Sequence, residues 1–173
     1  MGVEVRTAAE LIALDVEGRG PARRAARETA VMRGVLAAFV ERPGAVAVDA
    51  LLTAIPGEAP ERVREALAQL DRDDLIRLDG GRVDLAYPFS AAPTPFVVEL
   101  GGRRGSRYVC CAIDALGIAA MLDEPVGIRS ECHHCRAPIA LEVDPSGPGP
   151  GARDAMVWAA RQADADRRAC DTL

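Results

Sequence analysis

Residues 75–87 read LIRLDGGRVDLAY and carry a strong hairpin signal in the first half of the chain. Apolar and polar side chains alternate on both sides of Asp79-Gly80-Gly81, which is typical of two strands joined by a tight turn. Ahead of it, residues 29–44 (TAVMRGVLAAFVERPG) place apolar side chains at helical spacing and stop at a Pro-Gly breaker. Shorter helices are expected near residues 49–54 and 60–71. Three helices and a hairpin predict a winged helix-turn-helix.

A second domain is expected after this module. Residues 90–107 (SAAPTPFVVELGGRRGSR) carry two prolines at the start, three glycines near the end and the strand-like FVVEL between them. This composition is typical of a linker that leads into a first strand. We therefore predict an α+β chain in three parts. These are an N-terminal extension, helical in part, over residues 1–28, a winged-helix-like domain over 29–91, and a small mixed α/β domain over 92–173.

Composition narrows the class of protein. Of the 173 residues, 49% are hydrophobic and 27% charged, as in ordinary globular domains. No apolar run approaches the roughly 18 residues of a membrane span, and the N-terminus lacks the features of a signal peptide. These features predict a cytoplasmic protein without a membrane partner. In a reducing cytoplasm, five cysteines near two histidines are better explained as metal ligands or reactive thiols than as disulfides.

The charge distribution disfavours nucleic acid as a partner. The chain has 26 acidic and 21 basic residues, a net charge of −5. Residues 58–74, which include the second of the shorter helices, hold six acidic side chains and three basic ones, a local charge of −3. A helix that enters the major groove usually carries the opposite sign. We therefore expect a packing or dimerisation role for the winged-helix module, and the sequence leaves the oligomeric state open.

The residues able to do chemistry follow the linker. Residues 107–122 (RYVCCAIDALGIAAML) predict a helix that begins near Cys111, with Asp114 three positions on and therefore on the same face. A thiol in the first turn of a helix is expected to have a lowered pKa, and Asp114 could hold or pass a proton. Alternatively, the cysteines are small buried hydrophobes and the aspartate is solvated. The side chains expected to pack inward are Ala112, Ile113, Leu116, Ile118 and Met121.

A second thiol motif lies in residues 130–143 (SECHHCRAPIALEV). Cys132 and Cys135 form a C-x2-C turn, which is one half of many zinc sites because both sulfurs can reach one tetrahedral ion. Further ligands are sought among Cys110, Cys111, the two histidines and Cys170. The expected metal ligands are Cys110, Cys111, Cys132, Cys135 and His133, holding zinc or another thiophilic ion.

These two segments together resemble the core of the organomercurial (alkylmercury) lyases. In that family a Gly-Arg pair and a Tyr lead into a Cys-Ala-Leu-Asp-x-Leu helix, which a Ser-x-Cys turn and a strand follow. The matching residues here are Gly102-Arg103, Tyr108, Cys111-Ala112-Ile113-Asp114-Ala115-Leu116 and Ser130-Glu131-Cys132. The resemblance extends over roughly residues 30–170 and includes a winged-helix-like N-terminal domain.

The resemblance implies that a carbon–mercury bond is cleaved by protonolysis, without a cofactor, to give a hydrocarbon and Hg(II). By position, Cys111 is the first thiol, Asp114 the proton carrier, and Cys132 matches a mainly structural cysteine. The family's second catalytic cysteine lies further on. Cys170, in the final RRACDTL, lies close to where that segment should begin. We do not equate it with the family's second catalytic cysteine. We therefore expect a C-terminally shortened member in which mercurial binding is retained and cleavage is slow or undetectable.

Two other classes of function remain open on the sequence. One is a metal-binding winged-helix regulator, or a metal-sequestering protein, in which the thiols hold a thiophilic ion and no bond is broken. A regulator needs a basic stripe on the second helix or the wing, and only Arg77 and Arg82 lie near the hairpin. The other is a domain with structural zinc and an unrelated partner.

Overall fold

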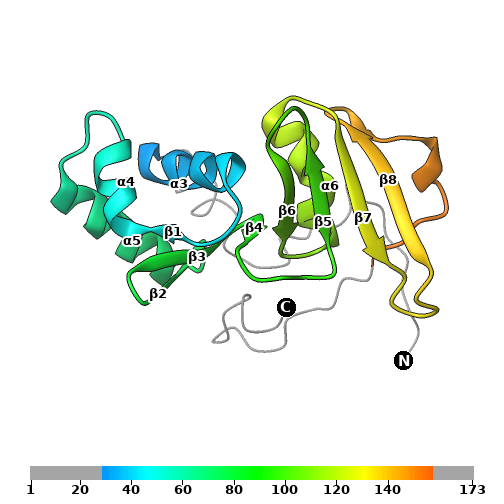
Figure 1. Cartoon of the computed structure of the whole chain (residues 1–173), viewed down its shortest axis with the longest axis horizontal. Coiled ribbons are helices and arrows are strands. Elements are labelled where there is room, and N and C mark those ends of the chain that lie inside the picture. Colours follow the sequence, from blue (N-terminus) through cyan, green and yellow to red (C-terminus); the bar gives the residue numbers. More distant parts are fainter. Residues whose placement is uncertain (1–28, 158–173) are drawn as a thin grey trace.

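The structure is a computed structural model, and it describes residues 29–157. The first half of this range contains the three helices and the hairpin that the sequence predicts (Figure 1). In chain order these elements are α3 (Ala30–Glu41), β1 (Val46–Ala47), α4 (Val48–Ala54), α5 (Pro60–Arg72), β2 (Ile76–Asp79) and β3 (Arg82–Ala86). The interpretation of this module as a winged helix stays a prediction. The expected N-terminal extension over residues 1–28 lies outside the described residues, as does Cys170.

Local signals in the sequence account for these boundaries. The Thr29 side chain caps α3 by accepting a hydrogen bond from the Met32 backbone N–H at 3.2 Å. Pro60 is the first residue of α5. Its lack of an N–H costs nothing there, because the first N–H groups of a helix have no intrahelical acceptor. Gly80 and Gly81 both have positive φ, at 52° and 76°, as the tight turn between β2 and β3 requires.

The second half of the described range adds six strands and one long helix. They are β4 (Phe89–Ser90), β5 (Val97–Leu100), β6 (Gly105–Val109), α6 (Ala112–Leu122), β7 (Val126–Glu131), β8 (Pro138–Asp144) and β9 (Gly147–Pro148), followed by the 3-10 turn η1 (Pro150–Ala152). Within residues 29–157 the strands form one nine-stranded antiparallel sheet in the order β1-β3-β4-β6-β5-β7-β8-β9, with β2 on β3. The chain is therefore a mixed α/β protein built on an antiparallel sheet.

The two halves of the sheet meet at β4. This short strand pairs with β3 on one side and with β6 on the other. The sheet is therefore continuous between the two halves, although a linker was expected near residue 92. In Figure 1, helices α3, α4 and α5 gather around one end of the sheet, and α6 lies against the strands of the other end. Phe39 of α3 and Phe89 of β4 stack with their ring centroids 6.1 Å apart. The hydrophobic core is thus continuous across the junction.

A buried arginine fastens the same junction. Arg107 of β6 is 4% exposed, and its guanidinium donates hydrogen bonds of 2.6 Å to the carbonyl oxygens of Phe39 and Val40 in the last turn of α3. It also donates to the carbonyls of Arg104 and Ser106. These bonds satisfy carbonyls that a helix end leaves without intrahelical partners. They therefore join α3 to the strand that leads into the thiol segment.

Helix α6 packs differently from the sequence prediction. Its buried residues are Ala115, Ile118 and Ala119, and Leu116 is partly buried against the core. Ile113 and Met121, which were expected to pack inward, are 54% and 40% exposed. The prediction for these two residues was wrong because α6 is apolar around most of its circumference, so its sequence does not identify one inner face.

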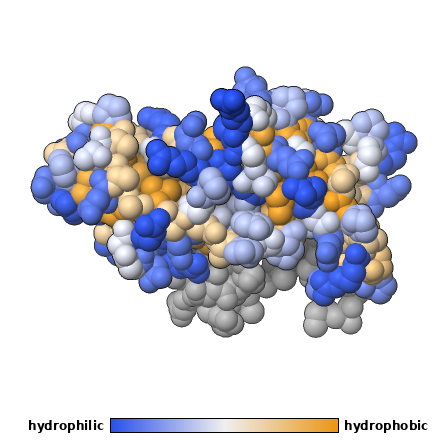
Figure 2. All heavy atoms as spheres, viewed as in Figure 1, coloured by the Kyte–Doolittle hydropathy of each residue, from blue (hydrophilic) through white to orange (hydrophobic). Residues whose placement is uncertain are grey.

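The surface of the described residues carries a mixture of polar and apolar side chains (Figure 2). The face drawn in Figure 2 carries mainly hydrophilic residues, with smaller hydrophobic areas between them. Over residues 29–157, no helix combines the length and the apolar character needed to cross a membrane.

Candidate thiol site

Cys111 and Asp114 come together at the start of α6. Strand β6 ends at Val109, and Cys111 then serves as the N-cap of α6 with an extended backbone (φ −151°, ψ 177°). The Asp114 backbone N–H donates a hydrogen bond to Cys111 Sγ at 3.4 Å, and the Cys111 thiol donates one to Asp114 Oδ2 at 3.0 Å. The structure therefore brings the two expected catalytic residues into direct contact.

The electrostatics of this pair differ from the sequence prediction. Burial raises the pKa of Cys111 to about 12, with further upward contributions from the charge of Asp114 and its hydrogen bond. The backbone N–H groups of Asp114 and Ile113 act in the opposite direction and are outweighed. The expected lowering of the pKa by the helix start was therefore wrong, because desolvation and a carboxylate in contact dominate over N–H donors. At neutral pH Cys111 is a thiol whose proton points at a carboxylate.

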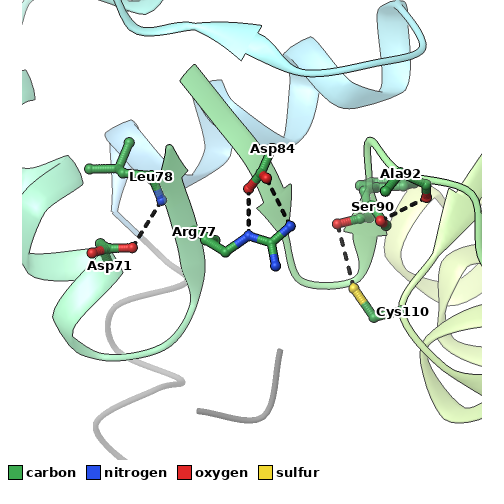
Figure 3. Close-up of polar contacts among 8 residues, drawn as sticks. Asp71, Arg77, Leu78, Asp84, Ser90, Ala92 and Cys110 are labelled. Carbon is green, nitrogen blue, oxygen red and sulfur yellow. Dashed lines mark hydrogen bonds and ion pairs between the residues drawn. The ribbon is translucent and has the colours of Figure 1, made fainter. Parts of the chain in front are cut away.

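Cys110 has different surroundings from its neighbour. It is 3% exposed and lies in a small buried cluster with Leu85 and Tyr87. Its thiol donates a 3.5 Å hydrogen bond to the Phe89 carbonyl, and this bond is the dashed line at Cys110 in Figure 3. Adjacent residues in an extended segment point to opposite sides, which explains why the two thiols have different partners. The structure assigns Cys110 to packing at the β4–β6 junction.

The C-x2-C turn forms the tip of the β7–β8 hairpin. Cys132 is half-buried, whereas His133, His134 and Cys135 are exposed. The backbone N–H groups of Cys135 and His134, followed by the Cys135 thiol, donate hydrogen bonds to Cys132 Sγ and lower the pKa of Cys132. Cys132 and Cys135 are therefore close together, with Cys135 exposed and Cys132 half-buried.

The predicted metal-ligand set is not assembled as one group. Over residues 29–157, no three His, Cys, Asp or Glu side chains are grouped so that they could hold a metal ion. Cys110 lies in the core, Cys111 contacts Asp114, and Cys132 contacts Cys135. The prediction that zinc binds this chain stays a prediction.

Strand register brings Cys111 and Cys132 to the same end of the sheet, a relation that the sequence analysis missed. Tyr108 on β6 and Arg129 on β7 both pair with Val97 of the intervening strand β5. Cys111 lies three positions after Tyr108, and Cys132 lies three positions after Arg129. Strands β6 and β7 run in the same direction because both are antiparallel to β5. No local sequence signal encodes this pairing, since it depends on strands far apart in the chain.

Cys111 and Asp114, which the sequence resemblance gave as first thiol and proton carrier, form a contacting pair at the start of α6. Residues 89–173 match the family model described as alkylmercury lyase, so this part of the chain is related to the alkylmercury lyases. The chain is 34% identical over 89 residues to an alkylmercury lyase of Streptomyces lividans, which covers 50% of this chain and 38% of that protein. It is 32% identical over 94 residues to one of Staphylococcus epidermidis, covering 54% and 41%.

The fold has a counterpart among solved structures. The crystal structure of the mercury-bound form of MerB2 superposes with a TM-score of 0.58 at 20% identity, over 84% of this chain and 80% of that one. This similarity concerns the fold and extends to more of the chain than the family match. The segments matched in the two curated relatives span about two fifths of each relative's length, 38% and 41%.

Proposed function

We propose that this chain binds organomercurials through Cys111 and cleaves the carbon–mercury bond by protonolysis, with Asp114 as the proton carrier. The family match over residues 89–173 supports the class of reaction. The observation that carries the assignment of residues is the 3.0 Å contact between Cys111 Sγ and Asp114 Oδ2.

The first step is the exchange of the thiol proton for mercury. Thiolate sulfur is the softest ligand among protein side chains, and Hg(II) is a soft cation. When an organomercurial R–Hg–X meets Cys111, a sulfur–mercury bond forms, X⁻ leaves, and the thiol proton passes to Asp114 Oδ2. The raised pKa of Cys111 keeps that proton on the thiol until mercury displaces it, so it is not lost to solvent beforehand.

The second step returns the proton to carbon. The protonated Asp114 is a carboxylic acid next to the sulfur that holds R–Hg, and it acts as a general acid toward the carbon. The electron pair of the carbon–mercury bond forms the new C–H bond, the hydrocarbon R–H leaves, and Hg(II) remains on sulfur. Asp114 is again a carboxylate, so one proton has moved from thiol to product.

Methane release from methylmercury tests this function. In the Cys132→Ser, Cys135→Ser, Cys170→Ser background, we expect the reduced chain to take up about one equivalent of methylmercury at Cys111. With excess small thiol as a second soft donor on mercury, it should then release methane slowly, as measured by gas chromatography of the headspace. Asp114→Asn should keep the bound mercury and lose the methane. Cys111→Ser should lose both.

Asp123→Asn is the matched control, because Asp123 caps the opposite end of α6 in a left-handed conformation that asparagine also adopts. It should leave methane release unchanged. Release that persists in Asp114→Asn would remove Asp114 from the reaction. Retained binding without any methane would favour a mercury-sequestering protein.

We also propose that residues 29–91 form a winged-helix-like module that does not bind duplex DNA. The order of helix, strand, helix, helix and hairpin supports the first part, and the charge of −3 over residues 58–74 supports the second. A salt titration of duplex DNA binding checks this. Tight binding with a steep salt dependence would instead support the alternative of a metal-binding winged-helix regulator.

A further inference from the structure

We propose that Cys132 and Cys135 form a second thiol site, which binds a soft cation such as Hg(II) through two sulfur atoms independently of Cys111. The choice of Hg(II) as the ion rests on the proposed function. The existence of a two-sulfur site rests on the geometry of the turn alone.

The turn is held in a fixed shape by its backbone. The Cys132 N–H donates to the Ala137 carbonyl at 2.8 Å, and the Arg136 N–H donates to the Cys132 carbonyl at 2.9 Å. Arg136 adopts a left-handed conformation with φ 61°, which closes the loop. The two hydrogen bonds close residues 132–137, the tip of the β7–β8 hairpin, and restrict the backbone of this turn.

The closed turn keeps Cys132 and Cys135 close to each other. The backbone N–H groups of Cys135 and His134, and the Cys135 side chain, lie near enough to Cys132 Sγ to act as its hydrogen-bond donors. In a C-x2-C turn of this kind both sulfurs can contact one ion, and the two N–H groups remain as donors to a metal-bound thiolate. Binding of Hg(II) would displace the thiol protons of both cysteines with little rearrangement of the loop.

The surroundings of the turn favour a cation that arrives from solvent and is stable with two ligands. Both histidines and Cys135 are exposed, so an ion can reach the sulfurs from solvent. In the part of the chain from 29 to 157, no group of three potential ligands is found around this turn, whereas zinc requires four. Hg(II) is stable with two thiolates, which matches what the turn provides.

The second site is separate from Cys111, although both lie at the same end of the sheet. Strand β5 lies between β6, which leads to Cys111, and β7, which leads to Cys132. The Cys111 thiol is directed to Asp114 of α6, whereas Cys132 Sγ accepts hydrogen bonds from its own turn. Each sulfur therefore has its own set of partners, and removal of Cys111 should leave the turn intact.

Mercury binding in the absence of Cys111 tests the proposal. We would use the full chain with Cys111→Ser and Cys170→Ser, add one equivalent of Hg(II) in the presence of a competing monothiol, and measure bound mercury by native mass spectrometry. The ultraviolet sulfur-to-mercury charge-transfer band gives a second readout. One equivalent should remain bound. Adding Cys132→Ser or Cys135→Ser should weaken binding about a hundredfold, since the second thiol of a chelate acts intramolecularly.

Cys110→Ser in the same background is the matched control. It also removes one thiol, and serine can still donate to the Phe89 carbonyl. This variant and His133→Ala should retain mercury. Unchanged binding in Cys132→Ser and Cys135→Ser would overturn the site, and loss in His133→Ala would contradict a two-sulfur ligand set. None of these outcomes depends on methane release, so the proposed lyase function can fail while this site stands.

Discussion

Cys111 and Cys132 are two thiols at the same end of one sheet, and their environments give them opposite properties. Each sulfur accepts hydrogen bonds from backbone N–H groups, Cys111 at a helix start and Cys132 in a tight turn. Nevertheless the pKa of Cys111 is raised to about 12, whereas the pKa of Cys132 is lowered. The difference lies in burial and in Asp114, which Cys132 lacks. A helix start alone therefore does not make a thiolate when a carboxylate contacts the sulfur.

The comparison predicts a large difference in alkylation rate, the largest effect expected here. At pH 8 in the wild-type chain, iodoacetamide should modify Cys132 roughly a thousandfold faster than Cys111, because only the thiolate reacts. Peptide mapping by mass spectrometry over time measures both rates in one sample. The Cys111 rate should keep rising with pH up to about 12, whereas the Cys132 rate should level off below the ordinary thiol value of 9. Similar rates at pH 8 would contradict the proposed difference.

Removal of the carboxylate should reduce that difference. Asp114→Asn abolishes the negative charge that raises the pKa of Cys111, so the thiolate fraction at pH 8 rises. Alkylation of Cys111 should become roughly tenfold to a hundredfold faster, as expected when one close charge is removed. The rate at Cys132 should not change, and Asp123→Asn should behave as wild type. A slower reaction at Cys111 would mean that Asp114 activates the thiol.

The smallest predicted effect is on stability. Cys111→Ala removes the N-cap acceptor of α6 and should reduce the free energy of unfolding by about 1 kcal/mol. Cys132→Ala, in a solvent-exposed turn, should change it by less than about 0.5 kcal/mol. Urea denaturation followed by circular dichroism compares the two variants. Cys111→Ser should recover most of the loss, because its hydroxyl can also cap the helix. Equal costs at both positions would indicate that capping by Cys111 contributes little.

Much of the fold follows from local patterns. The predicted α3, α5 and β2–β3 hairpin are present because capping, helical periodicity and a Gly-Gly turn act within a few residues. The inner face of α6 was predicted wrongly, since an almost uniformly apolar helix leaves its orientation to the sheet. The hydrogen bonds from Arg107 to α3 join residues 67 and 68 positions apart, and no local pattern in either segment predicts them.

The sequence predicted that Cys111 and Asp114 would lie together, but it did not predict the direction of the pKa shift of Cys111. The spacing of Cys111 and Asp114 correctly indicated that they share a helix face. The sign of the pKa shift depends on how far the helix start is buried, which residue spacing does not reveal. Likewise, the five expected metal ligands separate into different surroundings, because Cys110 points into the core and strand β5 lies between β6 and β7.

In the proposed reaction, mercury displaces the Cys111 proton onto Asp114. Infrared difference spectroscopy tests it most directly, in the Cys132→Ser, Cys135→Ser, Cys170→Ser background, before and just after one equivalent of methylmercury is added. The S–H stretch of Cys111 should disappear while the C=O stretch of a protonated carboxyl group appears, and the carboxyl signal should be absent in Asp114→Asn. Loss of the S–H stretch without a protonated carboxyl, with one proton released to the solvent, would contradict it.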